Sequence, residues 1–196
     1  MFFSPRPLLR TFAVCLLITF TISSLPARAA EKTRFRADDY KIDAILSPHD
    51  HKITARATVK ITALDDLNIA SFQLHNDLRL AKVTNASGKA LTADRNPQDS
   101  SVRVSLDSTL PKDQSTTLVF EYSGVLDSAD DSPVPGLQLT SINDDTSYLL
   151  YAGDWFPVND YGIDRFTATI TVTVPAHMIV VGSGKITEGK EPKLAG

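Results

Sequence analysis

KITARATVKIT, residues 52–62, alternates apolar and polar side chains without a break. A period of two places successive side chains on opposite faces of an extended chain, so the pattern predicts a β-strand with one buried face and one face in water. Residues 166–174, FTATITVTV, follow the same rule with threonine on the polar side. Threonine and valine suit a pleated surface, and we expect the best-defined strand of the chain there.

Shorter stretches with the same alternation predict further strands, and turn-forming clusters such as residues 47–50 and 85–88 separate them. The expected strands are residues 40–46, 69–74, 78–84, 102–106, 116–122, 137–140, 148–151 and 179–181. After residue 30, no segment longer than two turns shows a helical period of 3.6 residues. The predicted fold class is all-β, an antiparallel sandwich or an open, curved sheet.

The first thirty residues have the order of a secretory signal peptide. Two arginines precede an apolar run at residues 11–25, and small residues follow it. The run is shorter than the roughly 20 residues that span a bilayer. We therefore expect cleavage after Ala29 or Ala30, a domain covering residues 31–196, and a secreted or periplasmic product with no membrane association.

Composition narrows the function of the part that follows. The only cysteine is Cys15, so disulfide and thiolate chemistry are excluded after residue 30. Three of the 20 basic residues and none of the 23 acidic residues lie in the first thirty, which leaves 17 against 23 and a net charge of −6. A mildly acidic chain argues against a nucleic-acid partner, which would need a basic patch.

Histidines and carboxylates are the candidate metal-binding or catalytic groups of the chain. His49 and His51 are two residues apart, a spacing that could direct both imidazoles to one cation, but they fall in an expected hairpin turn without a third ligand nearby in sequence. We therefore interpret His49 and His51 as residues of a solvated turn. For His75 and His177 we expect structural roles. The chain has no G-x-S-x-G nucleophile motif. The adjacent aspartates at 130–131 and 144–145 are interpreted as solvated loop charges.

Residues 148–161, YLLYAGDWFPVNDY, concentrate aromatic side chains around a proline and include the only tryptophan. Composition leaves two alternatives open, core packing beneath a loop and a surface presented to another domain or to a ligand. The candidate interface or cleft-rim residues are Tyr148, Tyr151, Trp155, Phe156, Asp160 and Tyr161.

Several blocks of sequence follow one another in order between about Phe35 and Ile186. They are YKID (40–43) leading to ITARATV (53–59), FQLHNDL (72–78), FEYSG (120–124), WFP (155–157) with Asp160, and the strand at 166–175 followed by VGSG (181–184). In this order they resemble the amino-terminal domain of the aminopeptidase N family, the membrane alanyl aminopeptidase-like zinc metallopeptidases or gluzincins.

The resemblance implies a saddle-shaped antiparallel β-sandwich that packs against a thermolysin-like catalytic domain of the same polypeptide and helps to close the cleft for a peptide substrate. It places the zinc ligands and the general base in an H-E-x-x-H helix outside this domain. No histidine here is followed by glutamate. We therefore expect no catalytic residue and no cofactor in this chain, with zinc in the missing catalytic domain.

The chain departs from the family pattern at two places. Many members carry a glutamine of the first substrate pocket ahead of an alanine-arginine pair, whereas residues 146–153 contain Ala152-Gly153 and no glutamine. The role of that glutamine is not carried over. The family domain also continues with more strands after the glycine-serine-glycine bend, and we expect this sequence, which stops at Gly196, to be a fragment of a longer precursor.

Two functions are compatible with the sequence. The first is the non-catalytic amino-terminal domain of a secreted zinc aminopeptidase that removes amino-terminal residues from peptides. The alternative is a stand-alone exported β-sandwich that binds a peptide, a carbohydrate or a partner protein through residues 148–161. An enzyme complete in this chain has little in its favour.

Overall fold

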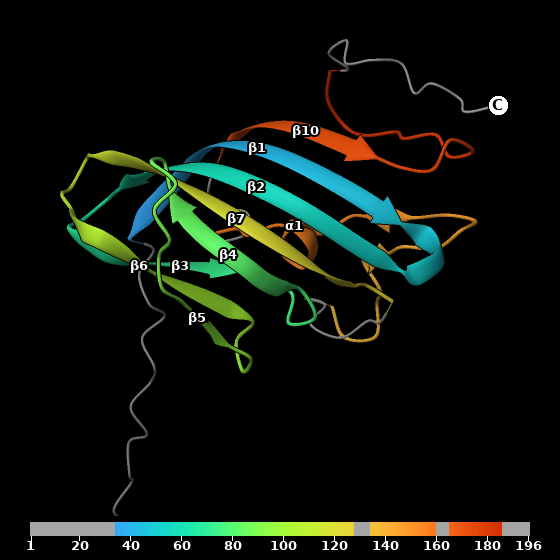
Figure 1. The fold of residues 1–196 in the computed structure, drawn as a ribbon, viewed down its shortest axis with the longest axis horizontal. Coiled ribbons are helices and arrows are strands. Elements are labelled where there is room, and N and C mark those ends of the chain that lie inside the picture. Colours follow the sequence, from blue (N-terminus) through green and yellow to red (C-terminus); the bar gives the residue numbers. More distant parts are fainter. Residues whose placement is uncertain (1–33, 128–133, 160–164, 186–196) are drawn as a thin grey trace, which may run out of the picture. The chain divides into compact units, whose positions relative to one another are not determined.

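The computed structural model describes residues 34–127, 134–159 and 165–185, which form a large curved sheet with smaller strands beneath it (Figure 1). Strands β1 (Phe35–Ser47) and β2 (Lys52–Ala63) pair antiparallel along almost their whole length. A short 3-10 turn, η1 (Pro48–Asp50), joins them, and the next residue, His51, adopts a left-handed φ of 52°. The hairpin expected around the two histidines is confirmed.

The large sheet has the strand order β10-β1-β2-β7-β4. Its other members are β7 (Ser115–Val125), β4 (Arg79–Asn85) and β10 (Thr167–Thr173). Neighbouring strands run antiparallel except β1 and β10, which are parallel. The antiparallel arrangement expected from the sequence therefore holds for all pairs of this sheet but one, and the parallel pair arises because β10 arrives through a long connection and not through a hairpin.

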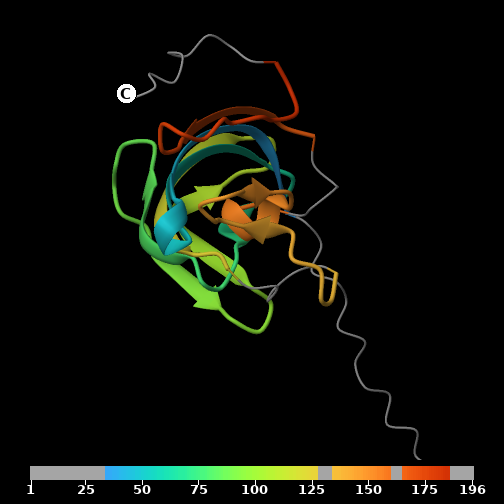
Figure 2. The ribbon, with the colours of Figure 1, turned by 90° about the vertical axis from the view of Figure 1, so that its right-hand side faces the viewer.

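A smaller sheet has the order β3-β6-β5, and the pair β8-β9 forms a two-stranded ribbon. The bounds are β3 (Leu67–Gln73), β6 (Ser101–Leu110), β5 (Ala93–Asn96), β8 (Thr140–Ser141) and β9 (Tyr148–Leu149). The one α-helix among the described residues is the single turn α1 (Ala152–Trp155). Figure 2 shows α1 enclosed between the curved large sheet and the smaller one. None of the helices in the described ranges is long and apolar enough to cross a membrane.

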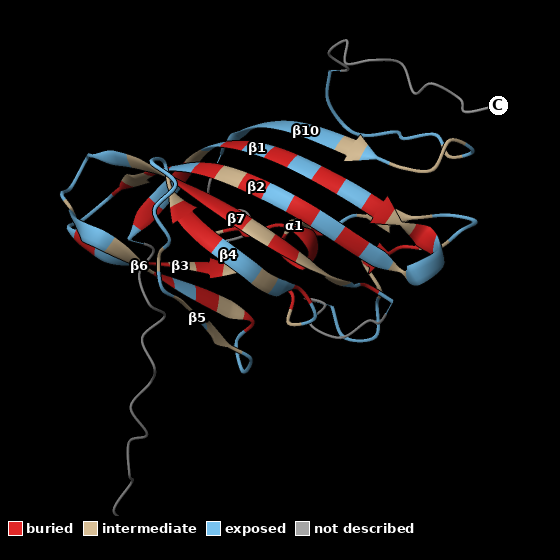
Figure 3. Ribbon diagram, in the orientation of Figure 1, coloured by how far each residue is buried: buried red, intermediate tan, exposed pale blue. Residues whose placement is uncertain are grey.

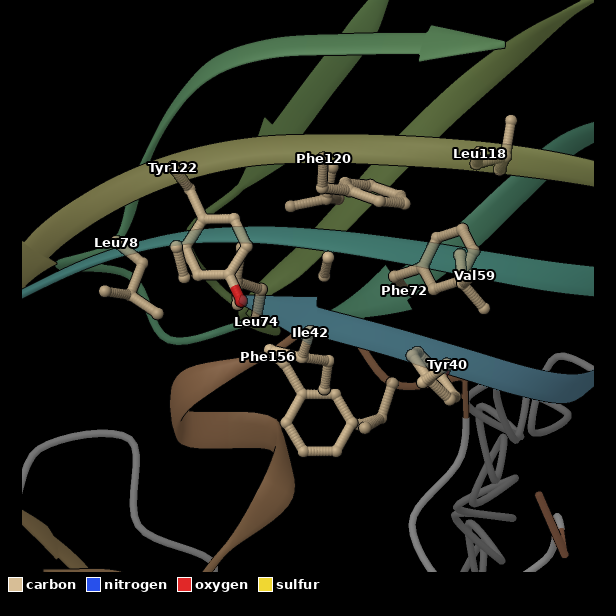
Figure 4. Packing of buried hydrophobic residues seen from close by; sticks show 14 of the residues in the cluster. Tyr40, Ile42, Val59, Phe72, Leu74, Leu78, Leu118, Phe120, Tyr122 and Phe156 are labelled. Atoms are coloured by element: carbon tan, nitrogen blue, oxygen red, sulfur yellow. The ribbon is translucent and has the colours of Figure 1, made fainter. Parts of the chain in front are cut away.

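The core lies between the two larger sheets. Along β2 the odd-numbered residues are buried and the even-numbered residues are largely exposed, which Figure 3 shows as alternating colours. Phe72 of β3 meets Phe120 of β7 with ring centroids 4.9 Å apart (Figure 4). The ring of Phe35 of β1 lies 5.0 Å from that of Phe72. Removal of these apolar faces from water is the main contribution to stability.

The all-β fold class is confirmed, and most expected strands begin and end within a few residues of the prediction. Two expectations were wrong, since residues 179–181 form no strand and only Thr140 of residues 137–140 does. Alternation reports which side chains could share a face, but a strand also needs a neighbour to pair with. The expected signal peptide, residues 1–30, lies outside the described residues.

Candidate functional site

The aromatic segment after β9 lies mostly inside the domain. Tyr151, Trp155 and Phe156 are buried, with Phe156 only 4% exposed, and Tyr148 is half-buried. The candidate residues Asp160 and Tyr161 fall outside the described residues. The structure thus brings three of the six candidates into the core, while the expected interface role of the segment stays a prediction.

Edge-to-face ring contacts hold this segment under the large sheet. The Phe156 ring lies 4.7 Å from the Trp155 ring and 5.3 Å from the Tyr40 ring of β1. Phe166, just before β10, lies 4.7 Å from Tyr40 and 6.3 Å from Phe156. Figure 4 shows Phe156 directly beneath β1, beside Tyr40 and Ile42. Such contacts add to the hydrophobic gain from burying the rings.

A buried hydrogen bond fixes α1 to the central strands. The Tyr122 hydroxyl of β7 donates to the Trp155 carbonyl at 2.8 Å. Burial, with a smaller contribution from neighbouring Tyr40, raises the pKa of Tyr122 well above its ordinary value. The phenol therefore stays protonated in the folded state and remains a donor to the end of α1.

Tyr122→Phe is expected to lower the free energy of unfolding by about 1–2 kcal/mol at neutral pH, because a buried carbonyl loses its donor. The substitution should also flatten the alkaline limb of the stability profile. The folded pKa lies above the unfolded value of about 10, so the stability linked to the protonated phenol is complete below pH 10 and declines by about 1.4 kcal/mol per pH unit above it. Urea unfolding at pH 7 and pH 10.5 measures both effects. An equal decline in the two proteins would contradict the assignment.

The end of β3 holds the other side of the segment. Gln73 and Val158 exchange backbone hydrogen bonds of 2.7 and 3.0 Å, and the Tyr151 hydroxyl donates to Gln73 Oε1 at 3.1 Å. The His75 N–H donates to the Gly153 carbonyl at 3.0 Å. The FQLHNDL block therefore positions the aromatic segment, a role that the sequence alone did not assign to Gln73 or His75.

Close packing explains the glycine in the Ala152-Gly153 pair. A Cβ built on Gly153 would lie 2.9 Å from Tyr151 Cε1 and 3.3 Å from the Gln73 amide. Both distances are shorter than ordinary van der Waals contacts, so any larger residue, arginine included, would displace the Tyr151 ring. The departure from the family pattern is thus accommodated by local packing.

Asp154 is a second positioning residue that sequence reasoning missed. Its side chain is buried, and its carboxylate accepts a hydrogen bond of 2.9 Å from the Thr140 hydroxyl of β8. A buried carboxylate requires partners of this kind. The bond ties the β8-β9 ribbon to α1. The residue pattern gave no signal for this pairing because Thr140 and Asp154 are 14 residues apart and lie in different elements.

The exposed part of the segment is apolar. Leu150 is 69% exposed, and its N–H donates to the Leu139 carbonyl at 2.9 Å, which continues the β8-β9 ribbon by one residue. Half-buried Tyr148 lies two residues before Leu150. Exposed Leu137 lies in the segment that leads into β8, the other strand of the ribbon. We call Leu137, Tyr148 and Leu150 the ribbon rim.

The histidines do not assemble a metal centre. His49 Nδ1 lies 3.4 Å from Asp144 Oδ2 at the surface, whereas His51 Nδ1 lies 2.6 Å from the Ile142 carbonyl. The buried His75 accepts a hydrogen bond from the Asp77 N–H at 3.2 Å. Within the described ranges, no three histidine, cysteine or acidic residues gather where they could hold a metal ion. Catalytic zinc takes three protein ligands, so these residues do not fit it.

No protein-family model matches the sequence, and no curated protein matches it significantly. A substrate-bound mutant of the M1 zinc metallopeptidase of Deinococcus radiodurans, in complex with Tyr-Ser-Ala, is similar in structure, with a TM-score of 0.69 and 21% identity over 81% of this chain. The unmutated enzyme gives 0.68 and 22% over the same share. A two-domain M1 zinc metallopeptidase mutant bound to L-tryptophan gives 0.65 and 20%.

The chain has the fold of an M1 zinc metallopeptidase domain. It spans only 36–37% of the length of these M1 structures. The expected resemblance is confirmed at the level of the fold.

Proposed function

We propose that this chain is a non-catalytic β-domain of an exported M1-type zinc aminopeptidase, which removes amino-terminal residues from peptides. The zinc and the catalytic residues would belong to another domain of the same polypeptide. The single observation that carries the proposal is the match of 81% of this chain to 36–37% of M1 zinc metallopeptidase structures. A domain with that share of the length leaves room for a separate catalytic unit.

In this proposal the ribbon rim contacts the catalytic domain and borders the peptide cleft. An exposed leucine next to a half-buried tyrosine is typical of a surface that becomes buried in an interface. Hydrogen bonds made by the side chains of Gln73, Tyr122 and Asp154 keep that surface in place. Export rests on the predicted signal peptide at residues 1–30.

The experiment compares the 196-residue chain with the product of the coding frame read beyond Gly196. The longer product is expected to encode an H-E-x-x-H helix, bind zinc and hydrolyse aminoacyl p-nitroanilides, whereas the 196-residue chain alone does neither. A stop codon directly after Gly196, together with binding of a peptide or carbohydrate by the chain itself, would favour the stand-alone binding module and overturn the proposal.

Within the longer product, Leu150→Asp is expected to reduce kcat/KM at least about tenfold, because a charge would be buried in the interface. Ile45→Asp is the matched control, since Ile45 is also an exposed aliphatic residue but lies on the polar face of β1. Equal effects of the two substitutions would argue against a specific role for the ribbon rim.

A further inference from the structure

The turn between β1 and β2 contacts the loop that joins β8 to β9. We call this loop, residues 142–147, the ribbon loop. Half-buried His51 places its Nδ1 2.6 Å from the carbonyl oxygen of Ile142, the first residue of the ribbon loop. Figure 1 shows the turn after β1 at the same end of the large sheet as the orange segment that contains this loop. A carbonyl oxygen only accepts hydrogen bonds, so His51 Nδ1 must carry a proton and act as the donor.

Backbone hydrogen bonds join the same two segments through Leu126. The His51 carbonyl accepts a hydrogen bond of 2.9 Å from the Leu126 N–H, and the Leu126 carbonyl accepts one of 3.3 Å from the Ile142 N–H. The side chains of Leu126 and Ile142 are buried. Polar backbone groups at such a place require partners. The His51 imidazole therefore supplies the ribbon loop with a donor that the backbone of the turn does not provide.

The backbone of His51 has a separate requirement. Its φ of 52° is left-handed, and its N–H donates to the Pro48 carbonyl at 3.1 Å. Glycine adopts this conformation without steric cost, and asparagine tolerates it better than most residues do. A glycine here would keep the turn but offer no donor to Ile142. The turn and the side-chain hydrogen bond can thus be tested independently.

The ribbon loop connects Ile142 to the ribbon rim. The Asn143 N–H donates to Ser147 Oγ at 3.0 Å, and the Ser147 hydroxyl donates to the Asn143 carbonyl at 3.0 Å. These two bonds close the loop on itself. Ser147 directly precedes Tyr148, which pairs with Ser141 in the ribbon. A displacement of Ile142 is therefore carried through the closed loop to Tyr148.

His49, two residues before His51, contacts the ribbon loop in a weaker way. Its Nδ1 lies 3.4 Å from Asp144 Oδ2, and the two side chains are 90% and 59% exposed. A pair of charged groups this exposed to water contributes little to stability. His49 is therefore a matched control for His51 from the same turn.

We propose that His51 is a positioning residue that sets the place of Tyr148 in the ribbon rim through its hydrogen bond to Ile142. The proposal rests on the proposed function, in which the ribbon rim borders the peptide cleft. A rim contacts the substrate equally before and during the reaction. Loss of the His51 donor should therefore weaken substrate binding and leave the chemical step unchanged.

Nitrogen NMR of the imidazole rings in the 196-residue protein tests the hydrogen bond. At about pH 8 an ordinary imidazole is neutral, and the hydrogen bond that it makes decides which nitrogen carries the proton. We expect the proton on Nδ1 of His51. Exposed His177 should show the Nε2–H form that a solvated imidazole prefers. A neutral His51 with its proton on Nε2 would overturn the proposal.

Two substitutions in the 196-residue protein test whether the ribbon loop follows His51. His51→Gly keeps the turn but removes the donor. His51→Asn tolerates the turn, and its Nδ2 lies as many bonds from Cα as the histidine Nδ1, so it can donate to the same carbonyl. The glycine variant should shift the amide resonances of residues 142–148, and the asparagine variant should shift them much less. Unchanged resonances in the glycine variant, or equal shifts in both, would contradict the role of His51.

Kinetics of the longer product, read beyond Gly196, test the consequence for the substrate. His51→Gly is expected to raise KM for an aminoacyl p-nitroanilide at least about fivefold with kcat within about twofold. His51→Asn should return KM close to the unmodified value, and His49→Ala should not change it. A fall in kcat at unchanged KM would overturn the proposal. If the longer product shows no aminopeptidase activity, the proposed function fails, and the NMR measurements alone decide whether His51 positions Tyr148.

Discussion

Phe156→Ala is expected to lower the free energy of unfolding by about 3–5 kcal/mol, the usual cost of removing a buried phenylalanine ring. The ring is 4% exposed and contacts the Tyr40, Trp155 and Phe166 rings. Hydrogen bonds made by the side chains of Gln73, Tyr122 and Asp154 hold the surrounding segment, so its backbone cannot easily collapse into the cavity. Urea unfolding at pH 7 measures the difference.

Leu150→Ala is the control for Phe156→Ala. It lies six residues away in the same segment but is 69% exposed, so its loss should change the free energy of unfolding by no more than about 0.5 kcal/mol. A loss below about 1 kcal/mol for Phe156→Ala would contradict the placement of the aromatic segment in the core.

The contrast between Phe156 and Leu150 shows what the sequence could predict about the site. The composition of residues 148–161 left core packing and surface display equally open. In the structure, residues 153–158 are all buried and Leu150 is exposed, so core packing accounts for most of the described segment. Which residue takes which role depends on Tyr122 and Gln73, 33 and 78 residues away from their partners in the segment. Local pattern carries no information about partners at that distance.

The positions of the strands could be predicted from the sequence more readily than the elements that pack against them. β2 was predicted from its alternation, because one of its faces is buried along its whole length. β5 was missed because ADRN does not alternate, and long-range contacts hold it in place instead. The Arg95 guanidinium donates to the Leu74 carbonyl at 2.9 Å and to the Leu78 carbonyl at 2.6 Å. β10 shows the opposite case, a strong alternation on a strand whose apolar face is exposed.

Two blocks of the family resemblance meet in space. The loop after FQLHN crosses the end of FEYSG, so the Asp77 backbone lies against Gly124 of β7. Arg95 holds the same loop from the other side. The blocks therefore form one packing unit, which explains why a glycine ends the second block: only a residue without Cβ allows the loop to approach this closely.

Gly124→Ala is accordingly expected to lower the free energy of unfolding by about 2–4 kcal/mol. A Cβ at this position would lie 2.1 Å from the Asp77 carbonyl oxygen and 3.0 Å from Leu78 Cα, so backbone and not a flexible side chain must move. Moving the loop would in turn disturb its hydrogen bonds to Arg95 and the hydrogen bond between His75 and Gly153.

Gly182→Ala is the matched control, because no atom lies within 4 Å of a Cβ built on Gly182. Its free energy of unfolding should stay within about 1 kcal/mol of that of the unmodified protein. Denaturant unfolding of the two variants distinguishes steric conflict from the general effect of replacing glycine, and equal stabilities would show that the Asp77 loop does not pack on β7.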